Sequence, residues 1–277
     1  MREERLLKTT QYGMPLMGLG TFGRTGAEGR DAILAALEIG YRHIDTAQTY
    51  ETEGECGEAF RLSGLKRSDI HFTTKISTEN FGPGALVPSL RRSLDRLGLD
   101  QVDLTLLHWP SPRGKVPLEV YVEQIGEAQM LGLTRNIGVS NFPIALLDAA
   151  QELLGDIRIV NNQFECHPYL QNKALVDHCR RTGVSVTCYL PIARGKLAGD
   201  PVLEPLAKSK NCSVEQLALA YNMARGLSVI PASANPDRLR TNFAAQALEL
   251  TEADMAIIGG VERGTRYINF DWAPQWD

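Results

Sequence analysis

Short apolar runs rich in β-branched residues alternate with amphipathic segments along almost the whole chain. The runs have the length of buried strands, whereas apolar positions in the intervening segments recur at helical spacing, as with Leu86, Leu90, Leu94 and Leu97. The pattern predicts eight strand–helix pairs, with strands in residues 17–22, 41–47, 70–75, 102–109, 134–141, 157–165, 184–190 and 227–233 and helices in residues 31–39, 53–62, 88–97, 118–131, 143–154, 172–182, 213–224 and 236–245.

Helix start and stop signals support this division. Ser213 and Gln216 have the spacing of a capping box, and Asp200 precedes a proline suited to a first helical turn. Glycines stand where left-handed helix ends are wanted, at Gly40, Gly98, Gly132 and Gly183. Strict alternation with buried parallel strands implies an α/β fold, and eight units allow an eight-stranded parallel β/α (TIM) barrel.

The two ends of the chain are expected to cover the two ends of the barrel. Roughly the first 16 residues, with a turn at Tyr12-Gly13, are expected to form an N-terminal β-hairpin that plugs the floor. The tail beyond Gly260 contains Phe270, Trp272 and Trp276 and is expected to fold over the opposite mouth. No linker or repeat divides the sequence, so we expect one barrel domain over residues 1–277.

Composition restricts the partners and the compartment. The net charge of -4 and the absence of a Lys/Arg cluster argue against nucleic acid, and no apolar stretch approaches the ~18 residues that span a bilayer. The N-terminal sequence MREERLLKTT lacks the apolar core of a secretory signal. Five scattered cysteines without a CxxC pair fit a reduced cytoplasmic protein with no zinc site. Nothing in the sequence demands an oligomer, so we expect a monomer.

Four residues follow successive predicted strands at the spacing of a proton-transfer site. They are Asp45 and Tyr50 in GYRHIDTAQTY, Lys75 in FTTK and His108 in LTLLHWP. Taken singly, the lysine could be a surface residue, the tyrosine a packing residue, the aspartate a helix cap and the histidine a strand-end residue. Neighbouring strand ends of a barrel meet at one mouth, however, so these side chains can converge. A phenol, an ammonium, a carboxylate and an imidazole suit protonation of a carbonyl oxygen.

The chemistry requires a tuned tyrosine. A free phenol has a pKa near ~10, and lowering it by ~2 units takes ~3 kcal/mol, about what an ammonium ~4 Å away supplies. Lys75 is therefore expected to lower the pKa of Tyr50, with Asp45 keeping the lysine charged. His108 would orient the carbonyl group or share the proton relay. Metal catalysis is less favoured, because no HxH or HExxH motif is present.

A reduction also needs a hydride donor. The chain has no GxGxxG motif, only Gly18–Gly20, but VIPASANPDRLRTN leads from a strand into a helix start. Its polar residues could bind a phosphate at the helix N-terminus, or its arginines could simply be solvated. Likewise, Ser140-Asn141 could only shape a turn, and Gln163 could only satisfy buried backbone.

Together, GYRHIDTAQTY, TTK, LLHWPSP, IGVSNF and VIPxS in this order resemble the aldo-keto reductase family over essentially the whole chain. Within the family, IARGK and the ending WAPQWD are similar to the B-type bacterial enzymes that reduce 2,5-didehydro-D-gluconate and methylglyoxal. The resemblance implies NADPH bound across the barrel mouth and Asp45, Tyr50, Lys75 and His108 as the catalytic residues. It further implies cofactor contacts from Gly20, Thr21, Ser140, Asn141, Gln163, Tyr189, Leu190, Ser233, Arg238 and Asn242. Of these, Ser140, Asn141 and Gln163 would hold the nicotinamide carboxamide and Tyr189 would stack on the nicotinamide ring. Ser233 and Arg238 would take the adenosine 2′-phosphate, and Asn242 the adenine.

Three departures from the family pattern bear on specificity. Ala232 replaces a lysine that would strengthen phosphate binding, Leu190 replaces a serine near the cofactor path, and Ser77 replaces a tryptophan of the pocket wall. With Phe22 and Trp109 as apolar walls, short mouth segments are expected to leave a shallow, wet pocket for small polar carbonyl substrates. The alternatives are a non-catalytic nicotinamide-nucleotide-binding barrel and a metal-assisted barrel enzyme.

Overall fold

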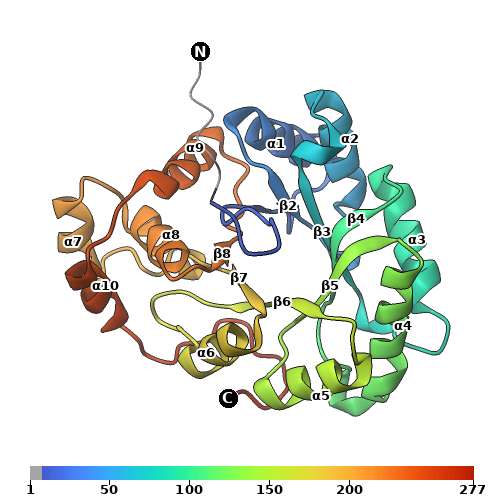
Figure 1. Cartoon of the computed structure of the whole chain (residues 1–277). Coiled ribbons are helices and arrows are strands. Elements are labelled where there is room, and N and C mark those ends of the chain that lie inside the picture. The colour runs from blue at the N-terminus through green and yellow to red at the C-terminus, as the bar shows by residue number, and fades with distance from the viewer. Residues whose placement is uncertain (1–7) are drawn as a thin grey trace.

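The computed structural model describes residues 8–277 and forms a ring of parallel strands surrounded by helices (Figure 1). Within these residues each strand pairs in parallel with the next along the chain, and a bridge between Met17 and Val229 joins the first strand region to the last. The TIM barrel predicted from the sequence is therefore confirmed. The strands are β1 Leu19–Gly20, β2 His43–Asp45, β3 His71–Ile76, β4 Val102–Leu107, β5 Thr134–Ser140, β6 Ile159–Glu165, β7 Ser185–Tyr189 and β8 Ser228–Val229.

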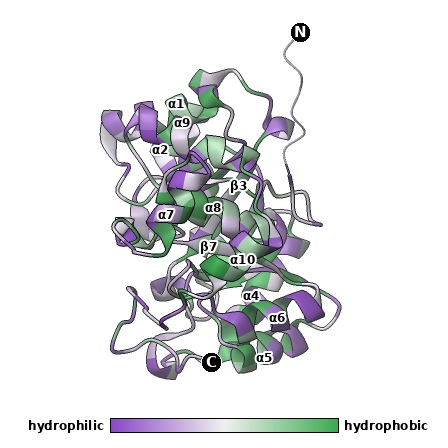
Figure 2. Cartoon of the chain, turned by 90° about the vertical axis from the view of Figure 1, so that its left-hand side faces the viewer, coloured by the Kyte–Doolittle hydropathy of each residue, from purple (hydrophilic) through white to green (hydrophobic). Residues whose placement is uncertain are grey.

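The helices lie outside the ring in chain order, and most begin and end close to the predicted positions. The α-helices are α1 Gly26–Ile39, α2 Glu53–Ser63, α3 Leu86–Leu97, α4 Leu118–Met130, α5 Ile144–Leu154, α6 Lys173–Thr182, α7 Leu203–Ser209, α8 Val214–Ala224, α9 Pro236–Ala244 and α10 Glu252–Gly259. Short 3₁₀ turns are η1 Gln48–Tyr50, η2 Arg67–Asp69, η3 Thr78–Asn80, η4 Pro112–Gly114, η5 Ala193–Gly195 and η6 Ala245–Ala247. Figure 2 shows hydrophilic and hydrophobic residues together on α5 and α6, as expected for helices with one face on the sheet.

Several boundaries differ from the prediction for local reasons. Helix α1 begins at Gly26 rather than Asp31. No helix range was predicted for α10, and for α7 only the start signal at Asp200 was predicted. Helix α10 starts at a capping box between Thr251 and Asp254, a signal in the sequence that the periodicity alone does not reveal. Strand β8 has two residues instead of seven, because Pro231 has no N–H with which to continue the ladder.

The predicted caps form at the helix ends. Ser213 and Gln216 make the expected capping box, and Asp200 accepts hydrogen bonds from the amides of Val202 and Leu203 at the start of α7. Gly98 and Gly183 adopt left-handed conformations with φ of 67° and 76°. These positions stop the helices so that the chain can return to the next strand.

The segment before β1 closes the barrel floor. Thr9 pairs with Pro15 in an antiparallel bridge, and the Leu16 amide donates to the Lys8 carbonyl at 2.9 Å. Met14 is buried against side chains from β4 and β6 (Leu104, Leu106 and Val160). In Figure 1 this dark blue segment crosses the middle of the ring. The hairpin prediction is thus confirmed for residues 8–16, while residues 1–7 lie outside the described part.

The C-terminal tail covers part of the opposite end, as predicted. Trp109, which follows β4, makes edge-to-face contacts with the rings of Phe270, Trp272 and Trp276, at centroid distances of 5.5, 5.2 and 6.0 Å. Among the described residues, none of the helices has the length and apolar character needed to cross a membrane.

Candidate active site

The four residues predicted to transfer a proton come together at the carboxyl ends of β2, β3 and β4. Asp45 ends β2, Lys75 lies near the end of β3 and His108 directly follows β4. Tyr50 ends the 3₁₀ turn η1, which bends the chain back over the strand ends. Asp45, Tyr50 and His108 line a cavity of about 550 Å³, with Lys75 fully buried beneath it.

A half-buried glutamine, Gln48, fixes the turn that presents Tyr50. The Gln48 side-chain oxygen accepts hydrogen bonds from the Ser77 amide at 2.8 Å and from Asn80 at 2.9 Å. Its Nε2 donates to the hydroxyls of Ser89 and Ser93, both at 3.1 Å. The turn is therefore tied both to the segment after β3 and to α3.

Lys75 is completely surrounded by acceptors. Its Nζ donates to Asp45 Oδ1, to the Thr46 carbonyl at 3.0 Å and to Tyr50 Oη at 3.4 Å. These contacts use all three protons of the ammonium, which is the condition for burying it in charged form. Gln163 Nε2 donates to the other oxygen of Asp45 at 2.7 Å, so the carboxylate is held from two sides.

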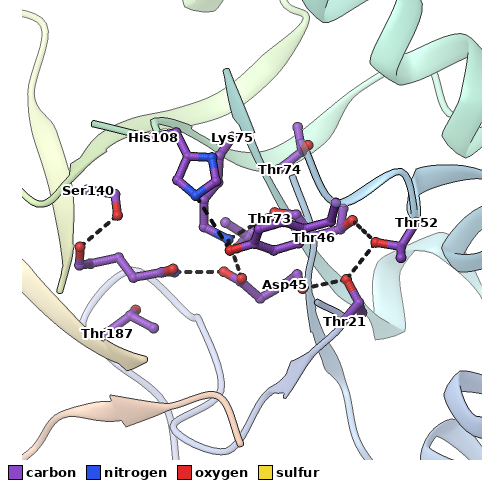
Figure 3. A network of polar contacts seen from close by, with 12 residues as sticks. Thr21, Asp45, Thr46, Thr52, Thr73, Thr74, Lys75, His108, Ser140 and Thr187 are labelled. Atoms are coloured by element: carbon purple, nitrogen blue, oxygen red, sulfur yellow. Dashed lines mark hydrogen bonds and ion pairs between the residues drawn. The ribbon is translucent and has the colours of Figure 1, made fainter. Parts of the chain in front are cut away.

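His108 completes the group on the far side of the phenol. Its Nε2 lies 3.5 Å from Tyr50 Oη, and Thr49 Oγ1 lies 3.3 Å from its Nδ1. Figure 3 shows the imidazole of His108 pointing toward the side-chain ends of Lys75 and Asp45. The phenol oxygen thus lies between an ammonium and an imidazole.

The pKa shifts agree with the prediction for Lys75 but not for Tyr50. Burial alone would lower the pKa of Lys75, yet the Asp45 carboxylate and the Tyr50 phenol raise it above its usual range. Burial raises the pKa of Tyr50, and the ammonium of Lys75 only partly opposes this effect. The expectation of a lowered pKa is therefore wrong, because desolvation of the phenolate outweighs the attraction of one ammonium. Burial, assisted by Lys75, holds the pKa of His108 well below its usual value.

The residues expected to hold a nicotinamide carboxamide line the same cavity on β5, β6 and β7. Asn141 has a left-handed backbone (φ 63°), donates to the His108 carbonyl at 3.0 Å and accepts from Tyr189 Oη at 2.8 Å. Ser140 Oγ donates to the main-chain oxygen of Gln163 at 2.8 Å. Hydrogen bonds thus link these side chains to both His108 and Asp45.

The loop after β7 and the end of β1 form the remaining cofactor-side wall. Gly20, Thr21 and Leu190 all line the cavity. Leu190, Ala193 and Arg194 have positive φ angles of 49°, 50° and 54°, a backbone conformation that residues other than glycine rarely adopt. Strain of this kind is concentrated at ligand clamps and active sites.

The residues expected at the adenosine end lie on a separate element. Ser233 precedes α9, Arg238 lies in its first turn and Asn242 is buried farther along it. Arg238 Nε donates to Ser233 Oγ at 3.5 Å, and no carboxylate of the described residues forms an ion pair with this guanidinium. Asn235 caps the helix by accepting from the amides of Asp237 and Arg238.

On the substrate side, aromatic side chains and the C-terminal tail line the cavity. Phe22 contacts the Tyr50 ring edge-on at 5.3 Å, and Trp109 and Ser77 are both buried. The tail adds three apolar side chains to the cavity lining (Ile268, Phe270 and Trp272). The shallow, wet pocket expected from the short mouth segments stays a prediction; at the rim of the cavity Phe22 is 68% exposed.

Two site features escaped the sequence analysis although their residues stand in the quoted motifs. Thr49 and Gln48 belong to GYRHIDTAQTY, but hydrogen bonds to His108 and to α3 cannot be inferred from spacing. Within residues 8–277, no three His, Cys, Asp or Glu side chains gather as metal ligands.

Comparison with known proteins gives a consistent result. The sequence model of the Aldo/keto reductase family matches residues 16–263. The methylglyoxal reductases DkgB of Yersinia pestis and Escherichia coli O157:H7 are 42% and 41% identical over 265 residues, covering 95% of this chain and 99% of each relative. A crystal structure of a protein provisionally named a 2,5-diketo-D-gluconic acid reductase B has a TM-score of 0.94 at 36% identity, with 98% of both chains covered. The aldose reductase of Schistosoma japonicum has a TM-score of 0.89 at 29% identity, with 97% of this chain and 98% of that chain covered.

Proposed function

This chain belongs to the aldo-keto reductase family and is an oxidoreductase that reduces carbonyl groups, and on that premise we propose that it uses NADPH to reduce small polar aldehydes and ketones, with Tyr50 as the general acid. The observation that carries the proposal is the phenol of Tyr50 in the cavity, hydrogen-bonded to Lys75 and beside His108.

The residues of the cavity and of α9 suit NADPH chemically. Asn141, Gln163 and Ser140 offer amide and hydroxyl groups at one end, and Tyr189 offers an aromatic ring. At the other end, the unpaired guanidinium of Arg238 and the hydroxyl of Ser233 suit a phosphate group. The bound cofactor would supply the hydride, and the family in general uses NAD(P)H.

The protein supplies the proton. The raised pKa of Tyr50 keeps the phenol protonated at neutral pH, ready to donate to a carbonyl oxygen. As the phenolate forms, the neighbouring ammonium of Lys75 stabilises the new charge without reorganisation. Neutral His108 would hold the carbonyl oxygen beside Tyr50, since its low pKa leaves the imidazole uncharged.

The substrate class follows from the relatives and from the walls of the cavity. The relatives named methylglyoxal reductase and 2,5-diketo-D-gluconic acid reductase suggest small activated carbonyl compounds. Glu79 and Arg194 add charged groups beside the aromatic wall and could bind hydroxyl or carboxylate groups.

A substrate panel tests this function. We expect oxidation of NADPH with methylglyoxal and with 2,5-didehydro-D-gluconate, at a kcat/KM at least tenfold above that for a steroid ketone. A higher kcat/KM for the steroid would contradict the substrate class. Nucleotide binding without turnover of any carbonyl compound would instead support the non-catalytic alternative. Monomeric state and cytoplasmic location stay predictions.

A further inference from the structure

A fully buried carboxylate lies behind the mouth of the cavity and takes no part in the proton transfer described above. Glu165 is the last residue of β6, and none of its side chain is exposed. Its Oε1 accepts from the Tyr267 amide at 2.7 Å, and its Oε2 accepts from the Ile268 amide at 2.8 Å. His167 Nε2 lies 3.0 Å from Oε1.

Both amides belong to the tail that forms the apolar wall of the cavity. Ile268 itself lines the cavity, followed by Phe270 and Trp272. The carboxylate of Glu165 therefore holds the tail by two hydrogen bonds where its cavity-lining residues begin. Because both of its oxygens are used, the direction in which the tail leaves the barrel is fixed as well as its position.

A second set of contacts connects the same point to the end of the tail. Asn172 Nδ2 donates to the Glu165 carbonyl at 2.6 Å, and its Oδ1 accepts from Arg266 at 3.2 Å. The Arg266 guanidinium lies 3.7 Å from the centre of the Trp276 ring. Asn172 thus links the backbone of Glu165 to Arg266 and, through Arg266, to Trp276 near the end of the tail.

Two further polar contacts join the tail to the mouth of the barrel, and both are solvent-exposed. The Ile144 amide at the start of α5 donates to the Asp277 carboxylate at 3.1 Å. Arg113 and Asp271 form an ion pair at 2.7 Å with side chains that are 71% and 77% exposed. Exposed pairs contribute little, whereas hydrogen bonds from backbone amides to a buried carboxylate are charge-assisted and shielded from water. The buried contact should therefore determine where the tail lies.

We propose that Glu165 is a positioning residue that fixes the C-terminal tail as one wall of the substrate pocket. This inference rests on the proposed carbonyl reduction, since the wall matters only if a substrate binds beside it. It assigns to Glu165 an effect on the affinity for apolar substrates and none on the proton donor, because its contacts lead to the tail and not to Tyr50.

Tryptophan emission tests the proposal without any reaction. The chain has three tryptophans, and Trp109, Trp272 and Trp276 all belong to the contact between the mouth and the tail. In Glu165→Gln, an amide NH₂ group replaces one acceptor oxygen and faces a backbone N–H. We expect the emission to shift to longer wavelength and acrylamide quenching to rise about twofold. Asp271→Asn, which weakens only the exposed ion pair, is the matched control and should leave both unchanged.

Steady-state kinetics give the second readout. For an aromatic aldehyde such as 4-nitrobenzaldehyde, we expect Glu165→Gln to raise KM about tenfold with a kcat within about twofold of the unmutated enzyme. The NADPH dissociation constant should not change. Combined with Trp272→Ala, which removes part of the wall directly, the effect on KM should be less than additive, because both substitutions act through the same segment.

The outcomes separate this proposal from the proposed function. Unchanged emission and unchanged KM in Glu165→Gln would overturn the positioning role, as would a fall in kcat at constant KM. If the unmutated chain reduces no carbonyl compound, the proposed function fails while the emission still tests the anchor. Should Glu165→Gln not fold by circular dichroism, Tyr267→Pro removes one amide donor from the tail side and must produce the same emission shift.

Discussion

At the scale of single residues, the proposed reaction would depend on the phenol of Tyr50, whose pKa is set by two opposing effects. Burial raises the pKa of Tyr50 and Lys75 lowers it, and burial prevails. In the proposed mechanism the tyrosine would therefore stay protonated until the carbonyl oxygen begins to gain charge. Lys75 would then act mainly by stabilising the phenolate that the transfer leaves, and less by making a free phenolate beforehand.

Tyr50→Phe should abolish reduction while NADPH binding changes less than twofold. The substitution removes only the hydroxyl that lies near Lys75 and His108 and leaves the ring packed against Phe22. We expect kcat to fall at least a thousandfold, measured by NADPH oxidation with methylglyoxal, with the dissociation constant followed by fluorescence titration.

The matched control is Tyr12→Phe in the floor hairpin, whose hydroxyl donates to the Gly183 carbonyl. It should retain full activity. Near-normal turnover in Tyr50→Phe would rule out the phenol as the acid. Lys75→Met is a less clean test, because it would leave Asp45 buried without its partner and destabilise the fold by about 3–5 kcal/mol.

At the scale of elements, the proposed binding of NADPH assigns recognition of its phosphate end to helix α9. The Asn235 side chain already accepts hydrogen bonds from two amides in the first turn of α9. This helix N-terminus therefore has fewer free N–H groups for a phosphate than an uncapped one would have. Ala232 carries no charge. The positive charge beside Ser233 therefore comes mainly from Arg238.

Arg238→Ala should weaken NADPH binding about ten- to a hundredfold, the loss of one charged hydrogen bond of ~1.5–3 kcal/mol, and should leave NADH binding nearly unchanged. Isothermal titration with both nucleotides measures this. Arg240→Ala is the control on the same helix, because Arg240 pairs with Asp237 at the surface. Equal affinity for NADPH and NADH in the unmutated protein would refute the assigned preference.

Elements were predictable from sequence where local signals are strong, and less so where packing decides. Periodicity located all eight strands and the helices that cover them, and the capping box at Ser213 formed as expected. No helix range was predicted for α7 or α10 because each is short. A segment of that length has too few apolar positions to distinguish a helix from other structure by its periodicity. The residues proposed for catalysis could be named from sequence motifs. The contact between Glu165 and the tail joins positions about a hundred residues apart in the sequence, and no local pattern reveals such a contact.

At the scale of the whole molecule, the barrel floor contains two histidines that link stability to pH, His43, which is buried, and His71, which is half-buried. His43 and His71 pack edge to face at 5.0 Å, and Met14 of the hairpin lies in the same interior. Burial lowers the pKa of His43 to about 4 and, with the nearby His43 and Arg67, that of His71 well below its usual value. Both side chains are therefore neutral in the folded state and can gain protons on unfolding.

The sign of the effect follows from these depressed values. The unfolded chain binds protons at pH below about 6.5, whereas the folded state does so only near pH 4, so stability is complete above pH 6.5 and falls between these values. His43 alone should cost on the order of 3 kcal/mol at pH 4. We expect urea denaturation to give a free energy of unfolding that decreases steadily from pH 6.5 to pH 4.

Replacing a histidine of the barrel floor should make the free energy of unfolding depend less on pH. In His71→Leu, the free energy of unfolding should change less between pH 6.5 and pH 4 than in the unmutated protein, whatever its value at pH 7. His178→Gln is the control, because His178 lies outside the floor and pairs with Asp148 at 2.7 Å. The same slope in His71→Leu and in the unmutated protein would show that carboxylates, and not the histidines of the floor, govern acid unfolding. A flatter slope in His71→Leu alone would locate the acid-sensitive point of the whole barrel in its floor, at the end opposite the catalytic mouth.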